Sequence, residues 1–311
     1  MKIGASTISA MYVGGVPVSA AYLGGVQVFA GADLSFASAT GGTETVITQD
    51  DKFYRVHTFL TSGELTVTQG GEFEYLVVAG GGGGGSRNLR AGGGGAGGLL
   101  KFVYEESGNT DIEPLALTED TFSVVVGDGG LGGTSASADV GQSGFASSFG
   151  PTINAIGGGG GASAAVLNGL NGGSGGGAGA SSAAGGDSGT PGAGSLGQGN
   201  NGGNAHSDGP LSSDNRGGAG GGAGSVGGNA GESIVAIGGD GKVTSIDGAS
   251  KLYAVGGSGG GDSDATNQAA NTGNGGAGSP SGAFSNAFSG GSGIVIIRYE
   301  ISQADYDAEA V

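Results

Sequence analysis

Short apolar or alternating runs, each ended by glycine, recur along the chain and predict β-strands. Residues 54–60, 65–68, 73–78 and 121–126 alternate or run apolar between glycine-containing turns. Residues 293–301 (Gly-Ile-Val-Ile-Ile-Arg-Tyr-Glu-Ile) are almost continuously apolar, which is typical of a strand buried on both faces of a sheet. No segment shows a sustained helical period. The pattern therefore predicts an all-β fold with the last strand at its centre.

The N-terminus carries a repeated segment centred on paired glycines. Residues 9–18 (Ser-Ala-Met-Tyr-Val-Gly-Gly-Val-Pro-Val) are followed by the similar residues 19–28 (Ser-Ala-Ala-Tyr-Leu-Gly-Gly-Val-Gln-Val). A type I′ hairpin needs two central residues with φ > 0, so Gly14-Gly15 and Gly24-Gly25 predict a three-stranded β-hairpin meander. Such a meander is marginally stable alone. We expect residues 1–30 to dock on a partner through Tyr12, Val16, Tyr22 and Val26.

Glycine tracts interrupt the strands and then dominate the chain, which has 80 Gly. They occupy residues 80–85, 92–98, 157–161 and most of 172–261, where large apolar residues are sparse. Ordering glycine costs more backbone entropy than ordering any other residue, so such tracts need dense hydrogen bonding. We predict a bundle of polyglycine II (PPII-type) helices, whose missing Cβ atoms allow close packing and N–H···O=C bonds between neighbours. Collagen is excluded because the chain has only 6 Pro and no strict Gly-X-Y period.

These patterns together predict how the chain is divided. The expected units are a hairpin docking module at 1–30, a linker with a first strand at 31–53, a β-rich domain with the first glycine tracts at 54–156, a glycine-rich helix bundle with loop insertions at 157–292, a closing strand at 293–301 and an acidic tail at 302–311.

Charge and composition narrow the partners. The formal net charge is −17, from 27 acidic and 10 basic residues, which argues against nucleic acid because its phosphates are bound by clustered Lys and Arg. Without Cys, neither disulfides nor thiolate metal sites can form. A hydrophobic fraction of 36% with only 12% charged residues is unlike a disordered chain. The uncharged segment 3–32 contains glycine pairs and alternation, so we expect hairpins and a soluble protein without a targeting segment.

Motifs for catalysis and cofactor binding are weak. Gly-x-Gly-x-x-Gly recurs by chance at this glycine density, and Gly241-Lys242 precedes Val243, which breaks the phosphate-loop pattern. His57 and His206 are isolated from each other, so no zinc ligand set is formed. We expect no cofactor, no metal site and no enzymatic activity.

Side-chain-rich insertions separate the tracts, at residues 86–90, 166–171, 204–216, 262–267 and 280–288. Binding residues commonly lie on loops held by a rigid frame. Asn, Asp and Arg can bond carbohydrate hydroxyls, and exposed aromatic rings can stack on sugars or protein. The receptor-binding candidates are Arg87, Asn88, Arg90, Leu167, Asn168, Asn171, His206, Asp208, Asn215, Arg216, Tyr253, Phe284 and Phe288.

The combination of strands and tracts resembles the glycine-rich domain of tail fibres and tail-tip adhesins of tailed bacteriophages. The resemblance covers residues 54–300 and rests on segments 76–85, 91–100, 126–130, 155–161 and 290–299. It implies a structural virion protein, assembled in the host cytoplasm, whose loops bind a bacterial polysaccharide or outer-membrane protein. It also implies contacts with other tail or baseplate proteins.

Three further points follow from the sequence and the resemblance. We expect a homo-oligomer, with a trimer favoured. A purely structural tail or baseplate component, in which the glycine region is a spacer, is an alternative. A non-viral ice-binding or matrix protein is a second alternative, because flat bundles of extended helices can also present ordered surfaces.

Overall fold

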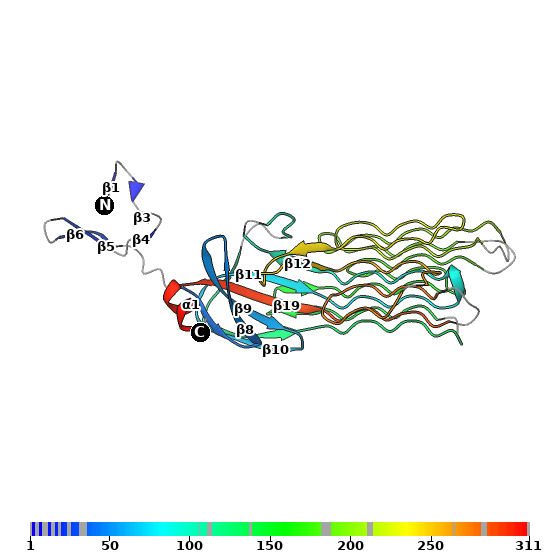
Figure 1. Cartoon of the computed structure of the whole chain (residues 1–311), viewed down its shortest axis with the longest axis horizontal. Coiled ribbons are helices and arrows are strands. Elements are labelled where there is room, and N and C mark those ends of the chain that lie inside the picture. Colours follow the sequence, from blue (N-terminus) through cyan, green and yellow to red (C-terminus); the bar gives the residue numbers. More distant parts are fainter. Residues whose placement is uncertain are drawn as a thin grey trace.

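The computed structural model places strands at one end of an elongated molecule and glycine-rich segments running side by side toward the other (Figure 1). Short strand pairs are described within residues 2–30. The other residues that the structure describes are 36–104, 106–110, 114–136, 139–181, 188–209, 214–263, 265–280 and 285–309. The fold is all-β apart from a 3-10 turn, η1 (Asn88–Arg90), and one short helix, α1 (Gln303–Glu309).

Two antiparallel sheets form a sandwich. The five-stranded sheet has the order β16 (Ile153–Ala155), β15 (Ser147–Phe149), β14 (Asp120–Val125), β10 (Gly63–Gln69) and β7 (Ser38–Thr40). The six-stranded sheet has the order β12 (Leu99–Phe102), β11 (Gly71–Val78), β19 (Ile294–Ile301), β9 (Lys52–Phe59) and β8 (Thr43–Gln49), with β13 (Leu115–Leu117) also paired to β11.

The main core lies between the two sheets. Phe73, Tyr75 and Val295 of the six-stranded sheet pack in one cluster with Leu65 and Phe149 of the five-stranded sheet, and all five are almost fully buried. Alternate residues of β11 and β19 point to the opposite face, where a second cluster is covered by the pair β17 (Lys242–Thr244) and β18 (Lys251–Tyr253). The six-stranded sheet is therefore buried on both faces.

The central position predicted for the last strand is confirmed. β19 pairs with β11 on one side and with β9 on the other, and it is buried along most of its length. The strands predicted at 54–60, 65–68, 73–78 and 121–126 are also present, as β9, β10, β11 and β14. Two further strands, β7 and β8, lie in the segment where the pattern indicated a linker and a first strand.

The N-terminal repeats form separate hairpins. β3 (Tyr12–Val13) pairs with β4 (Val16–Pro17), and β5 (Ala20–Leu23) pairs with β6 (Val26–Ala30). The registers Val13↔Val16 and Leu23↔Val26 leave two residues for each turn; these glycine pairs lie outside the described residues. The prediction of a continuous three-stranded meander was wrong, because β4 and β5 belong to different two-stranded sheets. β1 (Lys2–Ile3) and β2 (Ser6–Thr7) form a further two-stranded sheet. Pro17 has no N–H to donate to a further strand.

The glycine-rich segments form a hydrogen-bonded array, hereafter the tract array. It comprises residues 79–86, 91–98, 127–134, 139–146, 156–180, 188–206, 215–241, 254–262, 273–280 and 285–292. Tracts on both sides of residue 156 bond to one another; Gly95 N–H, for example, donates to Gly159 at 2.8 Å.

Residues 80–85 illustrate the bonding pattern, which repeats every three residues. Their N–H groups donate to three neighbouring tracts at 2.8–3.0 Å. Gly80 donates to Phe145 and Gly83 to Gln142; Gly81 donates to Gly291 and Gly84 to Phe288. Gly82 donates to Gly95 and Gly85 to Gly92. Their carbonyls accept bonds from three other tracts, around residues 130, 158 and 276. This tract is therefore bonded to neighbours on all sides.

Close packing explains why glycine is needed inside the array. A Cβ on Gly83 would lie 2.1 Å from the carbonyl oxygen of Leu131, a distance that no real Cβ contact shows. At the perimeter of the array, one residue in three does not need to be glycine because it faces solvent. Asp128, Leu131 and Thr134 are exposed, whereas the glycines between them are buried or half-buried. The spacing of non-glycine residues therefore marks which side of a tract faces solvent.

We predict that Gly83→Ala lowers the free energy of unfolding by about 2 kcal/mol or more, because backbone atoms of the neighbouring tract must move apart. The matched control Leu131→Ala changes an outward residue that is 60% exposed, and it should cost no more than about 0.5 kcal/mol. Urea unfolding of both variants measures the difference. Equal losses would contradict the packing argument.

His57 is buried between the sheet and the turn that precedes β8. Its Nδ1–H donates to the carbonyl of Gly41 at 2.7 Å, and its Nε2 lies 3.5 Å from the hydroxyl of Tyr299. That hydroxyl also accepts the N–H of Ala39 at 2.9 Å, which ties β19 to the edge strand β7. Burial lowers the pKa of His57, so the neutral imidazole is favoured in the folded protein.

The free energy of unfolding should consequently fall as the pH drops below about 6.5, the usual pKa of His, because the unfolded chain takes up the proton more readily than the folded one. His57→Gln removes the imidazole and should flatten this part of the pH profile. Urea titrations between neutral and mildly acidic pH test the expectation. An unchanged slope in the variant would show that other groups cause the pH dependence.

Candidate binding surface

The turns between tracts gather at the end of the array that lies away from the sandwich (Figure 1). We call this the distal end; its described turns are residues 86–90, 134–136, 139, 163–166, 206–209, 214–216, 231–235, 261–263 and 279–280. Side chains link turns that are far apart in sequence. Ser86 Oγ donates to the carbonyl of Thr134 at 2.7 Å, and Asn286 Oδ1 accepts the N–H of Ser135 at 2.9 Å.

Asn215 fixes the turn between residues 206 and 216. It is 1% exposed; its Oδ1 accepts the N–H of Asp208 at 2.8 Å, and its Nδ2 donates to the carbonyls of Gly209 and Ser181. His206 and Arg216 exchange both backbone hydrogen bonds, at 2.9 and 3.0 Å. Asn215 therefore shapes this turn from inside, although the sequence suggested a receptor contact.

The remaining candidates of this turn and of residues 86–90 lie at the distal end. His206 Nε2 lies 3.0 Å from Asp208 Oδ1, and both side chains are partly exposed. Arg87 is exposed and adopts φ 79°, a left-handed conformation that is uncommon for a residue with a side chain. Arg90 is half-buried. The side chain of Asn88 lies outside the described residues.

Asn168 and Asn171 form side-chain hydrogen bonds at the edge of the array. Their Oδ1 atoms accept the N–H groups of Thr190 and Ala193, at 3.0 and 2.7 Å, on the adjacent tract. The side chains thus replace a neighbouring backbone at a position where no further tract follows. Leu167, beside them, is half-buried, and its carbonyl accepts the N–H of Gly179 at 2.8 Å.

The aromatic candidates do not form a common surface. Tyr253 is 4% exposed in the second core cluster, far from the distal end, and burial raises its pKa to about 12. Phe288 is half-buried within the tract array, where its carbonyl accepts the N–H of Gly84. Phe284 lies outside the described residues. Of Tyr12, Val16, Tyr22 and Val26, the structure gives the strand pairing but not the side chains.

Sequence reasoning missed an open groove of about 530 Å³ at the distal end. It is lined by Leu131, Thr134, Asp139, Val140 and Val166, with neighbouring residues. Leu131 and Val166 are 60% and 54% exposed. The signal was the position of Leu131 between glycine pairs, which places its side chain outside the array.

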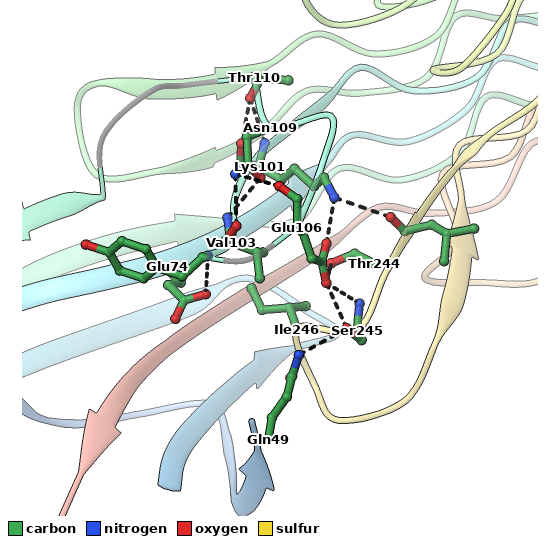
Figure 2. Close-up of polar contacts among 12 residues, drawn as sticks. Gln49, Glu74, Lys101, Val103, Glu106, Asn109, Thr110, Thr244, Ser245 and Ile246 are labelled. Carbon is green, nitrogen blue, oxygen red and sulfur yellow. Dashed lines mark hydrogen bonds and ion pairs between the residues drawn. The ribbon is translucent and has the colours of Figure 1, made fainter. Parts of the chain in front are cut away.

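A buried polar network lies at the other end of the molecule, where it joins the six-stranded sheet to the segment around β17 (Figure 2). The carboxylate of Glu106 accepts hydrogen bonds from Lys101 Nζ at 2.6 Å and from the N–H of Ser245 at 2.7 Å. Gln49 Nε2 donates to Ser245 Oγ at 3.3 Å and continues the network. Burial alone would raise the pKa of Glu106, but the bonds from Lys101 and Ser245 outweigh it and hold this pKa below its usual value.

A second ion pair adjoins this network. Arg298 is 1% exposed; it donates to Glu74 at 2.8 Å and to Gln49 at 2.7 Å, and it lies 4.2 Å over the ring of Tyr54. Burial raises the pKa of Glu74, and the nearby guanidinium opposes this rise. Because each charge is held by fixed partners, we interpret these residues as a structural contact between the six-stranded sheet and the segment around β17.

The described residues contain no group of three or more His, Cys, Asp or Glu side chains positioned to hold a metal ion. In the same part of the chain, no helix has the length and hydropathy that a bilayer span requires.

Sequence comparisons add one relation. A family model described as a glycine-rich domain matches residues 59–300, which include the whole tract array and the sandwich from β10 onward, but not β7, β8 and most of β9. No curated protein matches the chain significantly.

Proposed function

The chain belongs to the glycine-rich domain family, and we propose that it is a structural virion protein of a tailed bacteriophage, a tail fibre or tail-tip adhesin. In this proposal the distal end binds a polysaccharide or an outer-membrane protein on the host cell. The sandwich end faces the virion, and residues 1–30 dock on other tail or baseplate proteins. The protein acts by binding and not by catalysis.

One observation carries the proposal: the turns of the tract array lie at one end, and the C-terminal helix lies at the other (Figure 1). Helix α1 is fixed to the sandwich by Tyr306, whose ring lies 4.8 Å from that of Phe53, and by the ion pair between Arg55 and Glu309. Ala37, which directly precedes β7, also lies at the sandwich end, in the main core. An elongated molecule held at the sandwich end would present its turns outward.

We also infer that the tracts are polyglycine II helices. The three-residue period of the hydrogen bonds and of exposure along residues 127–134 supports this, because a polyproline II helix has three residues per turn. Described glycines with positive φ lie at turns or at the ends of tracts, such as Gly197 in a turn and Gly261 and Gly273 at tract ends.

The helix type can be measured by NMR. Couplings that report the backbone torsion of Gly82, Gly94 and Gly159 should give φ near −75° and not the −140° of an antiparallel strand. Their amide protons should also exchange slowly, because all three are bonded to neighbouring tracts. Strand-like torsions would contradict the polyglycine II assignment.

Assembly belongs to the same proposal. We infer a homo-oligomer, with a trimer favoured, that is assembled in the host cytoplasm and carried in the virion. A purely structural tail or baseplate component remains the alternative, in which the tract array is a spacer and its turns contact no receptor.

Exchanging residues 208–214 for a Gly-Ser stretch of equal length should abolish adsorption of the labelled protein to host cells. The exchange keeps Asn215 and the backbone bonds between His206 and Arg216. Within the described part of the exchanged segment, Asn215 bonds the backbone of Asp208 and Gly209 and no side chain. Folding should persist, which the melting temperature checks.

The control for this exchange is Lys251→Gln, at an exposed ion pair near the sandwich. This variant should adsorb like the unmodified protein. If the loop exchange and equivalent changes at 86–90 and 163–166 all leave adsorption intact, the chain is a spacer and not the adhesin.

A further inference from the structure

Most of the basic residues near the sandwich form ion pairs with acidic side chains. Near the sandwich the ion pairs are Lys52–Glu300, Arg55–Glu309, Lys101–Glu106, Lys251–Asp247 and Arg298–Glu74. The basic residues of the distal end are Arg87, Arg90 and Arg216. Within the described residues, neither Arg87 nor Arg216 has an acidic partner within 4.0 Å.

Arg216 is held in one position by its surroundings. Its backbone is paired with His206, and the next N–H, of Gly217, donates to the carbonyl of Leu89 at 2.9 Å. Its Nη1 lies so close to Gly261 that a Cβ there would be 3.0 Å away, and Gly261 has φ 101°. Glycine at 261 therefore gives the guanidinium its space.

The guanidinium of Arg216 is also incompletely bonded. Its Nε is buried and has no hydrogen-bond partner among the described residues. Buried polar groups nearly always have a partner. Arg216 as a residue is only half-buried, so a ligand can approach the guanidinium from its exposed side.

Nearby carboxylates are engaged elsewhere. Asp208 lies against His206 at 3.0 Å, Asp214 accepts Ser233 Oγ at 2.9 Å, and Asp262 accepts Ser258 Oγ at 2.7 Å. Each is thereby held toward its own turn. Among the residues that the structure describes, no carboxylate lies within 4.0 Å of this guanidinium.

We propose that Arg216 binds an anionic group, a carboxylate or a phosphate, of a surface saccharide. This inference rests on the proposed receptor-binding role of the distal end and names the chemical class of its ligand. A planar guanidinium bonds the paired oxygens of either group through two parallel N–H···O bonds. The exposed Arg87 adds positive charge at the same end.

The net charge of −17 does not prevent such binding. A tract such as residues 91–98 spans about 20 Å, which separates the distal end from the carboxylates of the sandwich. At physiological ionic strength, interactions between exposed charges are screened over about 8 Å. The carboxylates of the sandwich therefore have little influence there, and anion binding depends on the local balance between the arginines and the carboxylates of the distal end.

The direct test is an NMR titration of the unmodified protein that follows the Nε–Hε signal of Arg216. Glucuronate and inorganic phosphate serve as probes, and glucose is the neutral control. We expect a saturable shift with at least one anion and none with glucose, and the responding anion tells whether the source is a uronic acid or a phosphorylated sugar. Absence of a shift with both anions overturns the proposal.

Variants test the role of the side chain. Arg216→Gln should weaken binding of the responding anion about tenfold or more, because a charge-assisted hydrogen bond is lost. Arg216→Lys keeps the charge but loses Nε and the planar fork, so it should also bind more weakly. The distant control Lys251→Gln should bind like the unmodified protein. Equal affinity in Arg216→Gln would overturn the proposal.

Adsorption to host cells separates the two proposals. If Arg216→Gln adsorbs normally whereas the exchange of residues 208–214 does not, the anion site is wrong and the adhesin stands. If both changes leave adsorption intact, both proposals fail. Loss of adsorption in Arg216→Gln, with the backbone signals of His206 and Gly217 unchanged, supports the anion site.

Discussion

Backbone hydrogen bonding between glycine tracts is the interaction on which the molecule depends. Inside the array a tract such as residues 80–85 bonds its N–H and C=O groups to neighbours on all sides. This is possible only because no Cβ separates the backbones, as the 2.1 Å approach at Gly83 shows. Bonding of this density offsets the large entropy that glycine loses on ordering. A region with few large apolar residues can thereby be as regular as the sandwich beside it.

The sandwich supplies what the array lacks, a conventional hydrophobic core. Strands β11 and β19 lead directly into or out of tracts, so their positions set where those tracts begin. Arg298, paired with Glu74 inside the six-stranded sheet, donates to the carbonyl of Ile246 in the layer that covers it. Glu106, paired with Lys101, accepts the N–H of Ser245 in the same layer. With no Cys in the chain, packing, hydrogen bonds and these ion pairs connect the layers.

Sequence patterns predicted the strands well and the binding surface only in part. An apolar run such as residues 293–301 indicates a central strand, because only a central strand is buried on both faces. Which tract adjoins which was not predictable, since Gly82 and Gly94 carry no side chain that distinguishes their neighbours. For the same reason Asn168 and Asn171 looked like loop residues, although they bond the edge of the adjacent tract. Tyr253 looked available for stacking, but the register of β17 and β18 places it in a core.

The pairing of β9 with β19 has a consequence for biosynthesis. Phe53 lies opposite Ile301, so the central strand of the six-stranded sheet is translated long after its neighbours β9 and β11. All tracts are translated before that strand can insert. Such non-local pairing is slow to form, and an incomplete chain would leave β9 and β11 as unpaired neighbours of a vacant central position. Translation through β19 is therefore a condition for closing the fold, and chains that terminate before β19 would expose apolar strand edges that proteases and chaperones recognise.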